Sequence, residues 1–180
     1  MQVDLSKYDN SWFNPGQGII VRTIWHFTNT IFFTNGLFPF SGFKVFLLKI
    51  FGAQIGRGVV VKPRVNVKYP WNLSIGENTW IGEGVWIDNL AKVSIGANCC
   101  LSQGVLLLCG NHNYRRETFD LMVGEIILED GVWIGANSIV PGNSVCQTHS
   151  VLSLQSVAPV KMEPYMIYRG NPAVSVKKRV

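Results

Sequence analysis

The sequence predicts a mainly β solenoid, in which short parallel strands stack coil upon coil. Three blocks align at intervals of twenty residues without a gap, beginning at Ile55, Ile75 and Ile95. Within each block an aliphatic residue returns at every sixth position, as at Ile75, Ile81 and Ile87. A helix repeats its apolar face every 3.6 residues and a strand every 2, so a step of six fits neither alone. Fixed-period self-similarity of this kind is typical of repeat architectures.

A six-residue step fits an extended segment followed by a corner. Three such sides make one coil, and the pairs Leu73-Ser74 and Val93-Ser94 lengthen two coils to twenty residues. We expect the aliphatic residues to point into a common core, and the Gly, Asn and Asp positions to occupy corners that need a positive φ. A fourth block begins at Leu128. Each coil buries its face only against its neighbours, so several coils are needed for stability.

The length of 180 residues fits one domain with an appendage. We expect an N-terminal extension with helices over 1–52, a solenoid over 53–160 with an inserted loop at 113–125, and a C-terminal tail over 161–180. Hydrophobic residues make up 47% of the chain, and its mean hydropathy is +0.19. This apolar composition indicates that part of the surface is covered by other subunits.

The charge pattern argues against a nucleic-acid partner. The net charge is +5, yet the cations are clustered only at Lys177-Lys178-Arg179. Four cysteines without a paired CxxC spacing indicate neither a disulfide framework nor a zinc site. They fit a reducing cytoplasm best. Cys99 falls on an inward position of its repeat, so we expect it in the core.

The strongly apolar segment 17–51 lies outside the repeat. It predicts two short amphipathic helices, near 17–33 and 41–51, and no signal peptide precedes it. Polar residues interrupt it too often for a membrane span, which needs roughly 18 uninterrupted apolar residues. One interpretation is that the helices cap the solenoid and pack at a subunit interface. The other is peripheral contact with the inner face of a membrane. We favour the first, because the polar residues form no strong cationic face.

The chemistry is expected where the repeat breaks. The period is abandoned over 113–124 and resumes near Ile126. Insertions into a solenoid map to loops on one face, often the binding face. His112 stands directly before this loop. His26 lies in the apolar N-terminal segment and is interpreted as structural. His149 lies in an irregular coil, and we expect it at a surface corner.

Several stretches resemble one family, the hexapeptide-repeat acyltransferases, and within it the bacterial branch of colanic acid biosynthesis. The resemblance implies a left-handed parallel β-helix, although the general crossover rule favours the opposite hand. It also implies a homotrimer with active sites between subunits, acetyl-CoA as acyl donor, a sugar or saccharide acceptor, and no metal. The stretches that carry it are Asp4–Trp12, Phe38–Gly42, Val67–Trp71, Trp80–Leu90 and Gly170–Ala173.

The same resemblance implies a catalytic role for His112. The run Gly110-Asn111-His112-Asn113-Tyr114 matches the setting of the family's catalytic histidine. A neutral imidazole can take the proton of a sugar hydroxyl, which then attacks the thioester of acetyl-CoA. A backbone N–H is the simplest donor to the oxyanion. A covalent route through Cys109 is the alternative, and direct transfer is preferred because nothing marks this thiol as activated.

The remaining site residues are also carried over by resemblance. Hexads after Val145 lose their corner glycines, which puts the coil geometry there in question. Among the acceptor candidates, Asp88 and Asn89 could instead form a corner turn, which Asn and Asp favour. Tyr114 could stack on a sugar face, and Arg115 could instead belong to a solvated loop. For the acyl donor the candidates are Gly135, Ala136 and Leu154 along the pantetheine, with Arg169, Gly170 and Lys177 near the adenine and its phosphate. For the acceptor they are Asp88, Asn89, Tyr114 and Arg115.

Two other functions compete with acyl transfer. Metal-dependent carbonic anhydrases of this fold need three converging histidines, and only His112 and His149 lie in the repeat region. A non-catalytic assembly scaffold remains the alternative, although it would need neither the loop nor the histidine beside it.

Overall fold

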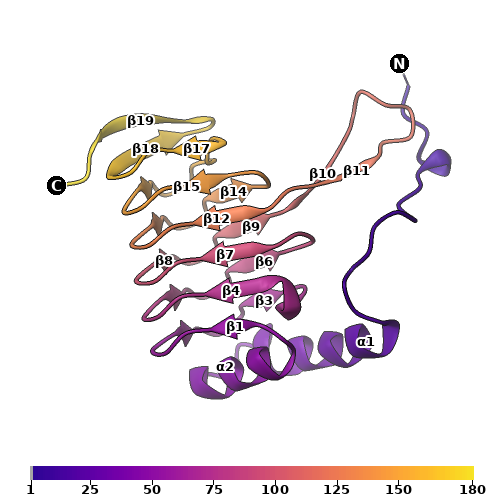
Figure 1. The fold of residues 1–180 in the computed structure, drawn as a ribbon, viewed down its shortest axis with the longest axis horizontal. Helices are drawn as coiled ribbons and strands as arrows, with labels where there is room; N and C mark the ends of the chain where they lie inside the picture. Colours follow the sequence, from indigo (N-terminus) through magenta and orange to yellow (C-terminus); the bar gives the residue numbers. More distant parts are fainter. Residues whose placement is uncertain (1) are drawn as a thin grey trace.

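The computed structural model describes residues 2–180 and shows a three-sided solenoid of parallel strands with helices across one end (Figure 1). The predicted fold class, a mainly β parallel helix with an N-terminal helical segment, is confirmed. The first side contains β1 (Gln54–Ile55), β4 (Leu73–Ile75), β7 (Val93–Ile95), β12 (Ile126–Leu128), β15 (Val145–Cys146) and β17 (Lys161–Met162). The third contains β3 (Asn66–Val67), β6 (Trp86–Asp88), β9 (Leu106–Leu108) and β14 (Ile139–Pro141).

The second side is closed at its top by an antiparallel pair. Strand β18 (Met166–Gly170) joins the parallel stack, and β19 (Ala173–Lys178) folds back along it. The other strands of this side are β2 (Val60–Val61), β5 (Trp80–Ile81), β8 (Cys100–Leu101), β13 (Trp133–Ile134) and β16 (Val151–Leu152).

The core is the column of aliphatic side chains that the six-residue step predicted. The strands pair in register, so that Ile75 lies beside Ile95 and Ile95 beside Leu128. These side chains are almost fully buried, as is Cys99, which confirms its predicted core position. Small polar residues inside the coils bond to the next backbone. The Thr79 hydroxyl donates to the carbonyl of Gly96 and accepts from the N–H of Cys99.

The corners confirm the expected positive φ at some glycines, such as Gly58 and Gly104, and correct it for the glycine of the Ile-Gly pairs. The Asn residues take the left-handed conformation, with φ of 57° at Asn78 and 55° at Asn98. The glycine two positions earlier does not. Gly76 is required because its coil packs against the next one, so that a Cβ there would lie 2.4 Å from the amide nitrogen of Ala97. Close inter-coil approach, rather than backbone handedness, excludes a side chain at this position.

The late coils stay regular despite their missing glycines. Strands β15 and β16 continue the first two sides, and Val157 bridges to Ile139 on the third. The left-handed corners are taken by Asn143, His149 and Gln155, with φ between 54° and 67°. His149 therefore occupies a corner, as predicted. Enough inter-coil hydrogen bonds form here to hold these residues in a conformation that the sequence alone disfavours.

The N-terminal helices pack across the β1 end of the solenoid. They are α1 (Ile19–Thr28), the π-helical turn η2 (Asn29–Phe33) and α2 (Ser41–Ile50), close to the predicted ranges. Trp25 is buried and its indole N–H donates to the carbonyl of Val67 at 2.8 Å. Lys44 is fully buried and donates to the carbonyl of Lys62 at 2.9 Å. Between residues 2 and 180, the structure contains no helix with the length and apolar character needed to cross a membrane.

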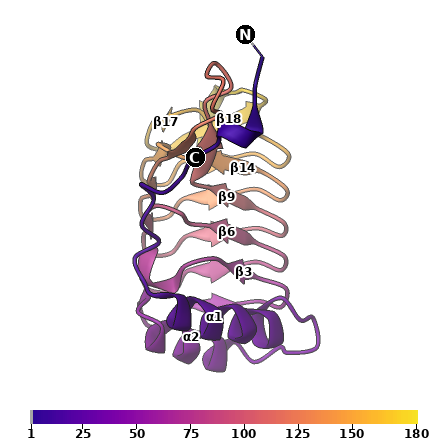
Figure 2. The ribbon, with the colours of Figure 1, turned by 90° about the vertical axis from the view of Figure 1, so that its right-hand side faces the viewer.

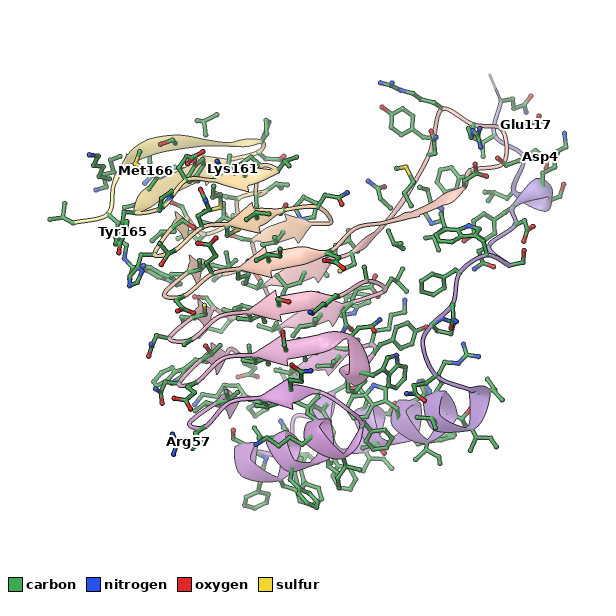
Figure 3. The ribbon with its side chains drawn as sticks, in the orientation of Figure 1. Asp4, Arg57, Glu117, Lys161, Tyr165 and Met166 are labelled. Atoms are coloured by element: carbon green, nitrogen blue, oxygen red, sulfur yellow. The ribbon has the colours of Figure 1, made fainter. Side chains whose placement is uncertain are left out.

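The interruption of the repeat forms an antiparallel hairpin, β10 (Gly110–His112) with β11 (Leu121–Val123), that extends away from the solenoid (Figures 1 and 2). The N-terminal segment, which carries the short helix η1 (Leu5–Lys7), runs up to the tip of this hairpin. Asp4 and Glu117 meet there, where the N–H of Asp4 donates to the carbonyl of Glu117 at 2.9 Å (Figure 3). Lys7 also pairs with the carboxylate of Glu117. A further short helix, η3 (Pro70–Asn72), sits at the corner before β4.

Two glycine variants separate inter-coil packing from backbone handedness. Gly84 has a φ of 69°, but a Cβ there would meet no atom closer than 3.9 Å. We expect Gly84→Ala to cost about 1 kcal/mol of unfolding free energy, the cost of the left-handed conformation. Gly76→Ala should cost about 3 kcal/mol or more, because backbone atoms must move. Urea unfolding followed by circular dichroism measures both, and equal losses would contradict this account.

Candidate functional site

A cleft of ≈ 750 Å³ lies between the third side of the solenoid, the base of the hairpin and the N-terminal segment. Its walls come from parts of the chain that are far apart in sequence. Tyr8 is contributed by the N-terminal segment, Arg22 by α1, Lys68 and Asp88 by the ends of β3 and β6, and His112 by β10. The indole N–H of Trp71 donates to the carbonyl of Pro15 at 2.6 Å, and this bond helps to hold the N-terminal segment over the cleft.

The ring of His112 is held in one orientation and one tautomer. Its Nδ1 lies 3.0 Å from the backbone carbonyl oxygen of Phe119, which can only accept a hydrogen bond. Nδ1 must therefore carry the proton, and in the neutral ring Nε2 is left with its lone pair. The ring also stacks on Phe119, with centroids 4.4 Å apart and planes inclined by 5°. Tyr8 packs at 5.7 Å from it.

Three charged groups from other elements share this cleft. Asp88 is largely buried, and its carboxylate lies 2.9 Å from the ammonium of Lys68. Arg22 also lines the cleft, and its buried Nε has no hydrogen-bond partner among the described residues. Two cations therefore face one carboxylate, and the cleft has a surplus of positive charge beside His112.

Asn89 supports the cleft without lining it. Its side chain is 0% exposed, its amide nitrogen donates to the carbonyl of Tyr69 at 2.6 Å, and its oxygen accepts from the N–H of Tyr69. Tyr69 does line the cleft. Both polar atoms of the Asn89 amide thus bond to the backbone of Tyr69. Asn89 therefore holds Tyr69 in place and does not itself contact the cleft.

The two residues expected from the loop lie away from the cleft. Tyr114 is 70% exposed, and the guanidinium of Arg115 lies over its ring at 5.6 Å. They sit at the outer end of the hairpin, where Arg116 pairs with Asp120 at 2.8 Å. Of the four acceptor candidates, only Asp88 shares the cleft with His112.

A second cleft, of ≈ 610 Å³, lies on the second side of the solenoid. Five of the six residues expected along the acyl donor line it together: Gly135, Ala136, Leu154, Arg169 and Lys177. The sixth, Gly170, is placed at the β18–β19 turn with a φ of 108°, and its N–H donates to the hydroxyl of Ser156.

This second cleft has an apolar wall and a cationic end. Trp133, Ile167 and Leu154 supply the apolar surface, and the indole N–H of Trp133 donates to the hydroxyl of Ser102 at 3.0 Å. Arg169 and Lys177 supply the charge. Such a groove suits a long ligand with an apolar arm and a phosphate-bearing end.

Sequence reasoning missed Tyr8, Arg22 and Lys68 as site residues. A signal was present for two of them, because Tyr8 and Lys68 lie inside stretches that carried the family resemblance. No spacing rule connects them with His112. Tyr8 reaches it through the packing of the N-terminal segment on the hairpin, Arg22 through the position of α1, and Lys68 through the pairing of β3 with β6. Arg22 had been counted merely as a polar interruption of an apolar helix.

Cys109 is three residues from His112 in sequence but is oriented into the core. Its side chain is 2% exposed, and burial raises the pKa of this thiol to about 11. A buried neutral thiol is a poor nucleophile. No group of three or more His, Cys, Asp or Glu side chains that could hold a metal ion occurs in the part of the chain that the structure describes.

The fold and the site together define the class: a hexapeptide-repeat β-helix with a single histidine at the base of an inserted hairpin. No family model matches the sequence. The chain is 30% identical over 168 residues to an Escherichia coli K12 protein that carries the provisional name colanic acid biosynthesis acetyltransferase WcaF, covering 93% of this chain and 92% of that protein. It therefore belongs to this family of acetyltransferases and is an acyltransferase.

Solved structures share the fold. A hexapeptide-repeat acetyltransferase of Vibrio cholerae, described in complex with acetyl coenzyme A, superposes with a TM-score of 0.80 at 20% identity over 89% of this chain and 88% of that one. A galactoside acetyltransferase in complex with coenzyme A gives a TM-score of 0.70 at 22% identity, covering 76% and 70% of the two chains. At these identities the likeness establishes the architecture.

The state of Cys109 yields a prediction about the chemical route. We expect Cys109→Ala to keep kcat within about twofold of wild type, because a thiol with a pKa near 11 contributes almost no thiolate at neutral pH. Steady-state kinetics and mass spectrometry of enzyme quenched with acetyl-CoA measure this. A loss of two orders of magnitude, or an acetylated Cys109 that is competent for transfer, would restore the covalent route.

Proposed function

We propose that this acetyltransferase transfers the acetyl group of acetyl-CoA to a hydroxyl of a sugar or saccharide in bacterial exopolysaccharide or capsule biosynthesis, with His112 as general base. The observation that carries the proposal is the bond from Nδ1 of His112 to the carbonyl of Phe119. It leaves Nε2 as the basic nitrogen in a cleft large enough for a sugar. The family relationship supports the acceptor class, since the provisional name of the Escherichia coli relative assigns that protein to colanic acid biosynthesis.

The proton and bond changes follow from this tautomer. Nε2 takes the proton from the acceptor hydroxyl as its oxygen bonds to the thioester carbonyl carbon. The tetrahedral oxyanion collapses, the carbon–sulfur bond breaks, and the imidazolium returns its proton to the departing CoA thiolate. The carbonyl of Phe119 keeps its hydrogen bond to Nδ1–H throughout and stabilises the imidazolium. No covalent enzyme intermediate is needed, in agreement with the burial of Cys109.

The acceptor is proposed to bind in the cleft beside His112. Asp88 offers carboxylate oxygens that accept from sugar hydroxyls, and Lys68 fixes that carboxylate at 2.9 Å. Arg22 has a buried donor without a partner in the described chain. An acceptor with an acidic or phosphate group would satisfy this donor and balance the surplus positive charge.

Acetyl-CoA is proposed to bind in the second cleft. Two structural relatives are described with acetyl coenzyme A or coenzyme A, and the groove here joins an apolar wall to Arg169 and Lys177. Gly135 fits a pantetheine path because the coils pack closely there, with the N–H of Gly135 bonded to the carbonyl of Leu152 at 2.7 Å.

A homotrimer with active sites between subunits is part of the proposal. The two clefts share no lining residue, since one lies on the third side of the solenoid and the other on the second. A donor in one subunit's second cleft would meet the His112 cleft of a neighbour whose third side faces it. We place the reaction in the cytoplasm, where a reducing environment suits the four free cysteines.

Removal of the base tests the mechanism. We expect His112→Ala to lower kcat by about a hundredfold or more, because general-base catalysis contributes on the order of 10²–10⁴. The KM for acetyl-CoA should change little, since His112 lies outside the second cleft. His149→Ala is the matched control, as this histidine is a corner residue stacked on Tyr165. Near-normal turnover of folded His112→Ala enzyme would refute the assignment.

Substitutions at two neighbouring lysines test whether acetyl-CoA binds in the second cleft. Lys177→Gln should raise the KM for acetyl-CoA about tenfold, because it removes one charge-assisted contact to phosphate. Lys178→Gln removes the same charge one residue further along β19, outside the cleft lining, and should leave KM within about twofold. Equal effects of the two changes would indicate only a general electrostatic attraction.

A further inference from the structure

The end of the solenoid beside β1 carries a surface that the proposed reaction does not use. We call the segment from Ile19 to Ile50, which comprises α1, η2, α2 and their connection, the apolar platform. Its inner face packs on the first coil through Trp25, Phe33 and Leu48, all buried. A helix that is apolar on its inner face alone would turn polar residues outward. The platform also exposes large hydrophobic side chains on its outer face.

The outer face of the platform is apolar and uncovered. Ten large hydrophobic side chains between Ile19 and Ile50 are at least 40% exposed, among them Ile20, Phe27, Leu37 and Phe46. Figure 3 shows hydrocarbon side chains projecting from these helices on the side away from the coils. Within it, Phe38, Phe40, Phe43 and Phe46 pack against one another. Such a concentration of exposed hydrophobic side chains marks an interaction site rather than ordinary solvent-facing surface.

The charged residues near the platform indicate what kind of partner could cover its outer face. No aspartate or glutamate occurs between Asn10 and Gly76, whereas the same stretch contains seven lysines and arginines. Of these, Lys44 is buried, and Arg57, Arg64 and Lys68 pair with carboxylates from later coils. Lys49 on α2 and Lys62 in the first coil are exposed and form no ion pair within residues 2–180. The platform therefore joins many exposed apolar side chains to two exposed, unpaired lysines, which add a modest positive charge without forming a strong cationic face.

A second copy of the platform fits these charges poorly. A symmetric contact would bring the same unneutralised lysines together, with no carboxylate from this stretch to pair with them. An anionic lipid surface is complementary on both counts, because its headgroups attract the lysines while the outer side chains enter the acyl boundary. Neither helix is long enough to cross the bilayer, so the geometry is that of a helix pair lying in the interface.

We propose that the apolar platform docks the protein on the surface of an anionic lipid bilayer. The docking does not depend on the reaction proposed above, but it places the active site usefully. A smaller hollow, lined by His26 and Asn29 of the platform, shares Arg22, Lys68 and Asp88 with the His112 cleft. A saccharide carried on a lipid would have a continuous path from the membrane surface to the base.

Vesicle co-sedimentation of the full-length protein tests the proposal. We expect wild type to bind phosphatidylcholine vesicles that contain about one quarter phosphatidylglycerol, and to bind pure phosphatidylcholine more weakly. Binding should fall as salt is raised from about 0.05 to about 0.5 M, because screening weakens the lysine contribution. Wild type that stays in the supernatant with both vesicle types would overturn the proposal.

Variants locate the surface. Phe27→Glu combined with Phe46→Glu should weaken binding to the anionic vesicles by at least about tenfold. Val160→Glu is the matched control, because Val160 is 70% exposed near the opposite end of the solenoid, and it should leave binding within about twofold. Leu37→Glu, at an 89% exposed position between the helices, replaces the double variant if thermal melting shows that it unfolds. Unchanged binding by the folded platform variant contradicts the proposal. The proposal is also contradicted if wild type does not bind vesicles and the platform variant only dissociates a larger assembly, as measured by light scattering.

Discussion

The close stacking of one coil on the next is the constraint on which the rest of this structure depends. Each Ile-Gly pair brings two coils into backbone contact, and the N–H of Gly76 donates to the carbonyl of Ile95 at 2.8 Å. A Cβ at Gly76 would lie within 2.4 Å of the neighbouring backbone. The aliphatic column, the regular sides and both clefts follow from this spacing, because every side chain in the repeat is placed relative to the coil above and below it.

The His112 cleft exists because the stack is interrupted without being broken. The hairpin leaves after β9, and the chain returns to the next coil at β12, where Ile126 lies beside Val93. The base of the hairpin is therefore as rigid as the solenoid, while its outer part carries Phe119 back to the imidazole. A rigid strand end and a returning loop together impose the tautomer that a general base requires. The N-terminal segment closes the remaining wall, held at Glu117 and Trp71.

The first and last coils of the solenoid are covered in different ways. A repeat stack exposes apolar surface at each terminus and needs a cap. At the late end the antiparallel pair β18–β19 covers the last coil with its own hydrogen bonds. At the early end the helices cover the first coil with Trp25 and Leu48 but present a second apolar face outward. The cap at the early end therefore carries the apolar platform, whose outer side chains remain exposed in the single chain.

The sequence by itself determined the fold class, the coil register and the place where the repeat is interrupted beside His112, because a six-residue step and its interruption are local patterns. The family resemblance named six residues for the acyl donor, and five of them line one cleft on the second side of the solenoid. Only the tertiary structure decided which residues surround His112 in its cleft. Tyr8 and Arg22 reach His112 through packing between segments roughly a hundred residues apart, and Asn89 is drawn inward to hold Tyr69. Only the tertiary structure also explains Gly76, because the clash that a side chain there would make with the next coil cannot be inferred from the local sequence.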